Sequence, residues 1–333
     1  MFLNKQSRIL RTLATLCLGL AVAGGSAFAA GNKIYNVIFV PKAMGIPWFS
    51  SMEKGLNDYA SQAGGLNFTV LAAPDTDPAA QARILQDAIA KKPDAIIVVP
   101  NDTKVLEPIM KQGMSKGIKM ISQEAPSVVN AVADIEFLIL EKEGKDLLDL
   151  LVKNGGPKGG YAIMVGGLTV ESHNKRADSM VAQQEKLYPD LHQVTSRLEG
   201  SENVQTAHDK TLELLTAYPD LVGIVYIGSL GAIGGAQAIA EKNLQGKIGI
   251  VGESLPSQAK KYLADKSMSA DYIGNPYRIG KDTAYITKFI LNGGKLANIG
   301  KLPEYGQNTV NGKIITFHAD TEVTAENADS FGF

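Results

Sequence analysis

The chain has 333 residues, of which 45% are hydrophobic and 20% charged, and its formal charge at neutral pH is −1. This mixed, nearly neutral composition argues against a protein that binds nucleic acid or a membrane surface through its net charge. A chain of this length can bury a core large enough to be stable without disulfides, and Cys17 is its only cysteine.

Residues 1–30 have the layout of a secretory signal peptide. Three basic residues precede a short apolar stretch at 13–23, and small residues follow it up to an expected cleavage site near Ala29 or Ala30. The stretch is too short for a membrane-spanning helix, and Leu16 before Cys17 does not suit lipid attachment. We therefore expect export to the periplasm, with a formal charge of −4 after cleavage because the leader holds no acidic residue.

Strands and helices are predicted to alternate through the first part of the mature chain. Asp77 is placed to cap a helix, and Pro78 suits the first turn of that helix. The apolar runs are continuous and rich in Val and Ile, which is typical of strands buried on both faces of a parallel sheet. The predicted strands lie at 34–40, 67–73, 95–99 and 118–122, with helices at 51–63, after Pro78 and at 101–116.

The same design returns later in the chain. Pro93-Asp94 and the apolar run after it are echoed by Pro219-Asp220 and a second apolar run, at an offset of 126 residues. Neighbouring runs keep a similar offset and predict strands near 161–165, 194–198 and 247–253. The chain is therefore predicted to be an α/β protein with two Rossmann-like lobes, each a parallel sheet with flanking helices.

We expect the two lobes to be joined by two or three strands of a hinge rather than to follow one another along the chain. The alternation weakens after Ala125-Pro126 and changes again at Gly274-Asn275-Pro276. A cleft between such lobes is the expected place for a small ligand. The predicted N-terminal lobe comprises residues 31–130 and 276–308, and the C-terminal lobe comprises residues 131–275 and 309–333.

Candidate site residues follow the apolar runs, because ligands of open α/β sheets bind beyond the carboxyl ends of the strands. An aromatic face beside carboxylates and hydrogen-bond donors suits a polyhydroxylated molecule. The candidate ligand-binding residues are Lys42, Trp48, Phe49, Glu124, Ser172, His173, Asn174, Ser229, Glu253, Ser254 and Asn275.

Several of these residues also have a purely structural interpretation. The aromatic pair Trp48-Phe49 could fill the interface between sheet and helix, and Ser172 could cap a helix. Glu253 could tie a hinge to backbone amides, so Glu124 is the stronger candidate of the two glutamates. Fully buried lysine is rare, which favours a ligand-binding role for Lys42 at the edge of a cleft.

The sequence gives little support for an enzyme, a cofactor or a metal site. Its four histidines lack metal-ligand spacing, and it has no glycine pattern for phosphates or dinucleotides. Residues 227–231 resemble a nucleophile elbow around Ser229 but lack the leading glycine. We predict a protein that is not an enzyme and has no cofactor; the minor alternative is a secreted hydrolase with Ser229 as nucleophile and His173 or His208 as base.

In the order and spacing of its features the chain resembles the type I periplasmic sugar-binding proteins of ABC transporters, of the ribose-binding kind. The features are the leader, Pro47-Trp48-Phe49 after the first strand, the runs at 94–98 and 118–124, and Tyr218-Pro219-Asp220. The resemblance covers nearly the whole mature sequence. It implies a monomer whose lobes close over one small sugar or polyol and which then docks on a membrane permease.

Within that family the chain looks most like the autoinducer-2-binding branch, on the strength of Pro41-Lys42 and the ending at 329–333. The branch has Asp where this chain has Glu124, and an Asp-Gln pair in place of Ser172-His173. These differences favour a sugar or polyol and leave an autoinducer-2-like furanose as an alternative. A sensory module that presents its ligand to a chemoreceptor or sensor kinase is another, and no nucleic-acid partner is expected.

Overall fold

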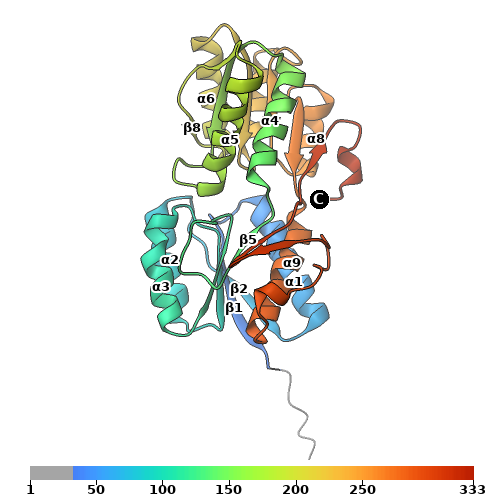
Figure 1. The fold of residues 1–333 in the computed structure, drawn as a ribbon. Helices are drawn as coiled ribbons and strands as arrows, with labels where there is room; N and C mark the ends of the chain where they lie inside the picture. Colours follow the sequence, from blue (N-terminus) through green and yellow to red (C-terminus); the bar gives the residue numbers. More distant parts are fainter. Residues whose placement is uncertain (1–32) are drawn as a thin grey trace, which may run out of the picture. The chain divides into compact units, whose positions relative to one another are not determined.

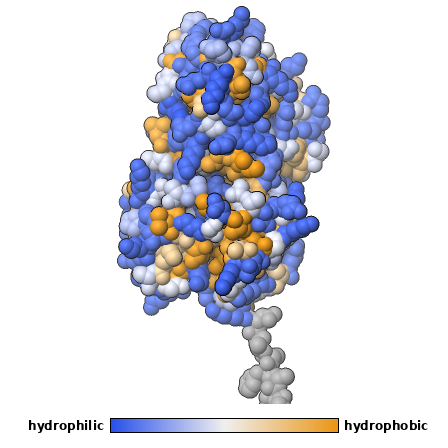
Figure 2. Space-filling view, in the orientation of Figure 1, coloured by the Kyte–Doolittle hydropathy of each residue, from blue (hydrophilic) through white to orange (hydrophobic). Residues whose placement is uncertain are grey.

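The computed structural model describes residues 33–333, and residues 34–333 belong to one unit. The expected leader at 1–30 lies outside the described residues. Within the described part, no helix is both long enough and apolar enough to cross a membrane. Figure 2 shows hydrophilic side chains over most of the viewed face, with smaller groups of hydrophobic ones between them. Amphipathic helices that turn their apolar sides toward a sheet produce such a surface.

The first lobe is built on a seven-stranded sheet (Figure 1). Neighbouring strands are parallel, apart from β12 with β13. The inner strand β3 is buried along its whole length, as its continuous apolar run predicts. In spatial order the strands are β12 (Thr309–Asn311), β13 (Ile314–Thr316), β5 (Ala133–Glu136), β4 (Lys119–Gln123), β3 (Ala95–Val98), β1 (Tyr35–Val40) and β2 (Leu66–Val70).

Helices cover both faces of this first sheet. They are α1 (Pro47–Ala63), α2 (Pro78–Ala90), α3 (Thr103–Ser115) and α9 (Pro276–Leu291). Asp77 caps α2, as predicted, by accepting hydrogen bonds from two backbone amides of its first turn. On the other face α1 and α9 touch backbone to backbone, because a Cβ on Gly280 would lie only 2.2 Å from the carbonyl oxygen of Met52.

The second lobe repeats this architecture on another seven-stranded sheet. Its edge strand β14 runs antiparallel to β11, and β8 pairs with β6 beside β7. In spatial order the strands are β14 (Thr321–Val323), β11 (Ala270–Ile273), β10 (Gly249–Gly252), β9 (Leu221–Ile227), β6 (Gly159–Val165) and β7 (Leu191–Gln193), with β8 (Leu198–Glu199) off this path. The helices are α4 (Leu140–Gly155), α5 (Glu171–Leu187), α6 (Val204–Ala217), α7 (Gly231–Glu241) and α8 (Pro256–Ala264). The described residues also form two 3₁₀ turns, η1 (Leu296–Asn298) and η2 (Ala328–Ser330).

The predicted fold of two α/β lobes is confirmed. The strands that follow the two Pro-Asp turns, β3 and β9, occupy inner positions of their sheets. Each pairs in parallel with the next strand of its unit, β3 with β4 in the first lobe and β9 with β10 in the second. The sequence repeat therefore reflects one α/β unit that is used twice, with the carboxyl ends of the strands available for a site.

The lobe boundaries lie later in the chain than the sequence predicted. The prediction ended segments of the first lobe at 130 and 308, but β5 pairs with β4 in the first sheet, and β13 pairs with β5. The chain crosses between the lobes at 137–139, 274–275 and 317–320. The prediction was wrong here because Asp134 and Glu136 interrupt the apolar pattern of β5, although both side chains are buried.

Candidate functional site

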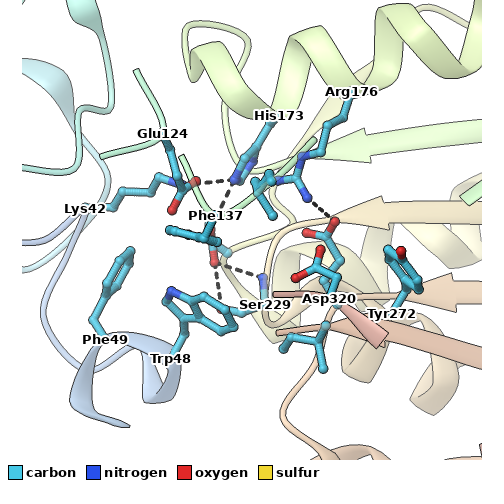
Figure 3. Close-up of a pocket in the computed structure, with 14 residues that line it drawn as sticks. Lys42, Trp48, Phe49, Glu124, Phe137, His173, Arg176, Ser229, Tyr272 and Asp320 are labelled. Carbon is cyan, nitrogen blue, oxygen red and sulfur yellow. Dashed lines mark hydrogen bonds and ion pairs between the residues drawn. The ribbon is translucent and has the colours of Figure 1, made fainter. Parts of the chain in front are cut away.

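A pocket lies where the carboxyl ends of the two sheets meet the crossing segments, and we call it the cleft pocket. The space between its walls, with the open mouth included, is about 400 Å³. Figure 3 shows the rings of Trp48, Phe49 and Phe137 near one another, the ring of Tyr272 apart from them beyond Asp320, and charged side chains around and between the rings. Its lining residues are Lys42, Trp48, Phe49, Glu124, Phe137, Leu138, His173, Arg176, Glu202, Ser229, Glu253, Tyr272, Ile273 and Asp320.

Lys42 follows β1 and carries its ammonium group into the cleft pocket. The backbone at this point is fixed because the side-chain amide of Asn101 donates to the carbonyl of Lys42 over 2.7 Å. The ammonium nitrogen donates to Oε2 of Glu124 at 2.9 Å, and both side chains are almost completely buried. A buried ion pair of this kind is stable only with short contacts and further hydrogen bonds, so its position in the site is well defined.

Glu124 follows β4 in a left-handed backbone conformation, with φ of 55°. Its Oε2 also accepts a hydrogen bond of 2.9 Å from the hydroxyl of Ser172, which belongs to the other lobe. Burial by itself would raise the pKa of the Glu124 carboxyl, but Lys42, Arg176 and the hydroxyl hold it below the ordinary value. Glu124 is therefore an ionised acceptor that touches both lobes.

His173 lies one residue further along α5 and is neutral, because burial and the charges of Lys42 and Arg176 lower its pKa well below the ordinary value. Its Nδ1 accepts from the amide of Gly166 at 3.1 Å, and its Nε2 lies 3.0 Å from Nζ of Lys42. A neutral imidazole accepts at only one nitrogen. With Nδ1 accepting from Gly166, Nε2 carries the ring proton and cannot accept from Lys42, so an N–H of the ammonium group remains for a ligand oxygen.

Arg176 enters the cleft pocket from the next turn of α5 and binds two carboxylates. It forms a close ion pair with Glu253 and a longer one, of 3.5 Å, with Glu143. The other oxygen of Glu253 accepts from the backbone amide of Gly228 at 3.1 Å. Burial raises the pKa of Glu253 to about 7 in spite of the arginine. The pair orients Glu253 at the end of β10 and holds it at the edge of the pocket.

Glu202 and Ser229 form a second polar contact within the same lobe. Oε2 of Glu202 accepts from both the amide and the hydroxyl of Ser229, at 3.2 Å and 3.1 Å. Burial raises the pKa of Glu202, while Lys42 and Ser229 lower it. The hydroxyl of Ser229 thus donates to a carboxylate, and the contact holds Glu202 and Ser229 together at the pocket wall.

Aromatic rings form the apolar side of the cleft pocket. Trp48 and Phe49 belong to the first turn of α1, and the Trp48 ring lies 5.9 Å from the ring of Phe137 at an angle of 35°. The Phe49 ring meets Phe39 of β1 edge-on at 6.3 Å. Trp48 and Phe137 come from different segments of the chain, so the crossing that contains Phe137 takes part in the pocket. Such faces suit the C–H groups of a small ring or chain.

The cleft pocket brings together seven of the candidate residues and leaves four outside its lining. Ser172 is buried beside it and bonds to Glu124, whereas the other three have structural contacts. Asn174 bonds to backbone carbonyls of the preceding loop, the amide of Ser254 donates to Asp271, and Asn275 caps α9. The candidates that line the pocket are Lys42, Trp48, Phe49, Glu124, His173, Ser229 and Glu253.

Seven lining residues were missed by the sequence reasoning. Arg176 follows His173 by three positions on α5, so helical spacing could have pointed to it. Phe137, Leu138 and Asp320 lie on the crossings, outside any strand or helix, so no periodicity predicts the direction of their side chains. The missed residues are Phe137, Leu138, Arg176, Glu202, Tyr272, Ile273 and Asp320.

The described residues hold no cluster of three or more His, Cys, Asp or Glu side chains placed to bind a metal ion. The ionisable groups of the cleft pocket are instead joined to one another by hydrogen bonds and ion pairs. This arrangement provides acceptors, donors and aromatic faces for a small polar molecule.

Comparison with known proteins places the chain in an established family. The model of the periplasmic binding protein domain matches residues 37–295. The D-allose-binding periplasmic protein of Escherichia coli is 23% identical over 288 residues, which are 84% of this chain and 91% of that protein. The D-ribose/D-allose-binding protein of Pseudomonas aeruginosa is 23% identical over 69% of this chain and 74% of its own length.

Solved structures share the fold over most of the chain. LsrB from Clostridium saccharobutylicum in complex with AI-2 superposes with a TM-score of 0.82 at 20% identity, covering 90% of this chain and 100% of that one. An ABC transporter solute binding protein from Clostridium phytofermentas with bound L-rhamnose gives 0.81 at 21% identity, covering 90% and 98%. At these identities the likeness concerns the fold.

Proposed function

Because the chain belongs to the family of periplasmic binding protein domains, we propose that it is the solute-binding component of an ABC importer that captures a small sugar or polyol. The observation that carries the proposal is the cleft pocket, in which aromatic rings lie beside charged and hydrogen-bonding side chains. Sugars and polyols present C–H groups and hydroxyls in the same arrangement. The names of the curated relatives, which bind D-allose, D-ribose or D-xylose, support this ligand class.

Ligand capture would depend on groups from both lobes. Lys42 and Glu124 come from the first lobe, and His173 and Arg176 come from one face of α5 in the second. A ligand that contacts both sets favours the closed arrangement, because the separated lobes cannot make both sets of contacts. The crossings at 137–139, 274–275 and 317–320 are the segments that would bend.

The remaining steps follow from the same role. A solute-binding component delivers its ligand unchanged, so we assign the chain a binding function in the periplasm and a membrane permease as partner. The expected leader at 1–30 supports export. The autoinducer-2-like alternative is not favoured, because Glu124 and the pair Ser172-His173 differ from the residues that this branch uses.

A thermal unfolding screen against pentoses, hexoses, polyols and autoinducer-2 tests the proposal. A ligand at a hundred times its dissociation constant stabilises the folded protein by about 2.7 kcal/mol, which corresponds to a rise in Tm of several degrees. We expect such a rise with at least one sugar or polyol, and recovery of that compound unchanged after release. The proposal fails if millimolar amounts of every neutral compound leave the Tm unaltered.

The variant Trp48→Ala shows whether a stabilising compound occupies the cleft pocket. It removes the ring that contacts Phe137, and we expect affinity in calorimetry to fall by more than about tenfold. Phe289→Ala, at the far end of α9 and outside the pocket lining, provides a control for the loss of an aromatic ring. Equal affinity in the wild type and in Trp48→Ala would place the binding site elsewhere.

A further inference from the structure

A second hollow adjoins the cleft pocket, and we call it the rim pocket. The space between its walls, with its open mouth included, is about 590 Å³. Its lining residues lie in the loops after β1 and β2 of the first lobe and in the loops after β6, β8 and β9 of the second. Like the cleft pocket, it therefore lies at the carboxyl ends of the strands, where open α/β sheets bind ligands.

The two pockets share part of their wall. Glu202 lines both of them, and Ser229 of the cleft pocket is followed in the chain by Leu230 of the rim pocket. The amide of Gly166, in the rim pocket, donates to His173, in the cleft pocket, over 3.1 Å. A Cβ on Gly166 would lie 2.9 Å from side-chain atoms of both Glu202 and His173. The pockets therefore meet where these three residues pack together.

Glu202, at this boundary, has one carboxyl oxygen that the protein leaves unused. Its Oε2 accepts from the amide and the hydroxyl of Ser229. Its Oε1 lies 3.9 Å from Nε2 of His173 and receives no hydrogen bond from residues 33–333. The side chain is only 6% exposed, yet Oε1 is not one of the fully enclosed oxygen atoms without a partner. A hydroxyl of a ligand that passes the boundary can therefore donate to Oε1.

The side chains of the rim pocket suit a neutral unit with both C–H and hydroxyl groups. Met44 and Leu230 give its wall an apolar part, and Met44 is 58% exposed. The hydroxyl of Thr76 makes no hydrogen bond with residues 33–333. The lining contains no lysine or arginine, and its charged residues are the acids Asp75 and Glu202. An anionic unit such as a phosphate or a carboxylate would therefore be repelled.

We propose that the ligand is a neutral disaccharide, with one ring in the cleft pocket, the second in the rim pocket and the linkage beside Glu202. The second ring would cover the exposed side chain of Met44 and add buried apolar area. Both pockets have walls from both lobes, so both rings would favour closure. This inference rests on the proposed function and narrows its ligand class from small sugars and polyols to molecules of two rings.

Matched compounds test the inference on the wild-type protein. Cellobiose, maltose, lactose, melibiose and xylobiose are titrated by calorimetry beside D-glucose, D-galactose and D-xylose and the methyl glycosides of these three sugars. A methyl glycoside blocks the anomeric hydroxyl as a disaccharide does, but it lacks the second ring. We expect at least one disaccharide to bind about tenfold to a hundredfold more tightly than its monosaccharides and their methyl glycosides, because the second ring adds hydrogen bonds and buried apolar area.

The double variant Met44→Ala with Thr76→Ala locates the second ring. Both side chains line the rim pocket, and neither lines the cleft pocket. We expect the preference for the disaccharide over the methyl glycoside to shrink by about threefold to tenfold, since apolar contact and a hydrogen bond are lost. Leu168→Ala is the matched control, because Leu168 is an apolar side chain of similar exposure, 53%, outside both pockets. Its preference should equal that of the wild type.

The outcomes separate this inference from the proposed function. Monosaccharides or polyols that bind as tightly as every disaccharide would overturn the inference and leave the function standing, with the rim pocket as an opening to solvent. A disaccharide preference that survives unchanged in the double variant would overturn the assignment of the second ring to the rim pocket. Absence of binding by every disaccharide, monosaccharide and polyol at millimolar concentration would contradict both proposals.

Discussion

At the scale of single residues, the ion pair of Lys42 and Glu124 is the contact on which the cleft pocket depends most. The two atoms are 2.9 Å apart, and the side chains are only 3% and 7% exposed. Each charge alone would be costly to bury, and each compensates the charge of the other in the pair. Its partners Ser172 and His173 come from the second lobe, so the pair also joins the lobes.

Replacing Lys42 by methionine should destabilise the folded protein strongly. The variant Lys42→Met leaves Glu124 buried without its cation, and breaking a buried pair in this way costs about 3–5 kcal/mol. The double variant Lys42→Met with Glu124→Gln removes both charges and should recover most of this loss. Urea unfolding of the wild type, both single variants and the double variant measures the coupling. A double variant as unstable as Lys42→Met alone would contradict this explanation.

The residues of the site were predictable where they follow strands, and unpredictable where they lie on crossings. Lys42, Glu124 and Glu253 follow β1, β4 and β10 within two residues, so the rule for open α/β sheets finds them. Asp320 sits on an irregular segment that reaches the pocket only through tertiary structure. Asn275 illustrates the converse, because a capping side chain at a conspicuous turn has the same sequence signature as a ligand-binding one.

At the scale of secondary structure elements, the contact of α1 with α9 attaches a C-terminal segment to the first lobe. A Cβ on Gly280 would lie 2.2 Å from the carbonyl oxygen of Met52, and one on Gly55 would lie 2.0 Å from that of Tyr277. No side chain fits at these distances unless the helices separate. The sequence indicated the helix at 51–63 but not this requirement, which only the mutual position of the two helices creates.

Gly280→Ala should therefore lower stability even though alanine is the better helix former. We expect a loss of about 1–3 kcal/mol from overpacking, measured as a shift of the urea midpoint. Gly300→Ala is the control, because a Cβ at Gly300 meets no atom within 4 Å. The close approach of α1 and α9 would be refuted if the two variants were equally stable.

The strand β5 contains two buried carboxyl groups, and their effect on stability can be tested. Asp134 and Glu136 lie on the same face of the strand, where the Asp134 carboxylate accepts from the hydroxyl of Ser122 at 2.6 Å. Burial and the neighbouring Asp134 raise the pKa of Glu136 well above its ordinary value of 4.5. The folded protein thus retains a proton that the unfolded chain releases. Stability from this group is complete below pH 4.5 and is lost as the pH rises through the raised pKa.

Glu136→Gln should remove this pH dependence. Glutamine stays neutral and can donate its amide to Asp134 at any pH, so the variant should be more stable than the wild type at pH 8, with the difference shrinking toward pH 4. Thermal unfolding across this range provides the measurement. Glu213→Gln, at an exposed position of α6, controls for the loss of one negative charge. A difference that stays constant with pH would contradict the retention of a proton by Glu136 in the folded protein.

At the scale of the whole described unit, the two lobes also touch through contacts that need no ligand. The hydroxyl of Thr169 donates to the carbonyl of Asn101 at 2.8 Å, and Glu171 accepts from the amide and the hydroxyl of Ser127 at 3.2 Å and 2.5 Å. Both contacts lie beside the cleft pocket. They join the loop before α5 and the first turn of α5 to loops of the first lobe. They favour closure, so part of the stability of the closed form is independent of the ligand.

Glu171→Gln should shift the free protein toward an open form without altering the pocket lining. The variant weakens the contact with Ser127, and the apparent dissociation constant rises as the closed fraction falls. We expect an affinity loss of about threefold to tenfold, together with a larger radius of gyration by X-ray scattering in the free protein but not in the complex. The control is Glu141→Gln, which removes an acidic residue from the first turn of α4. The negative charge of Glu141 stabilises that helix terminus as the charge of Glu171 stabilises the terminus of α5. If Glu141→Gln and Glu171→Gln change affinity and scattering alike, the effect comes from the helix terminus, and the contact across the cleft does not control closure.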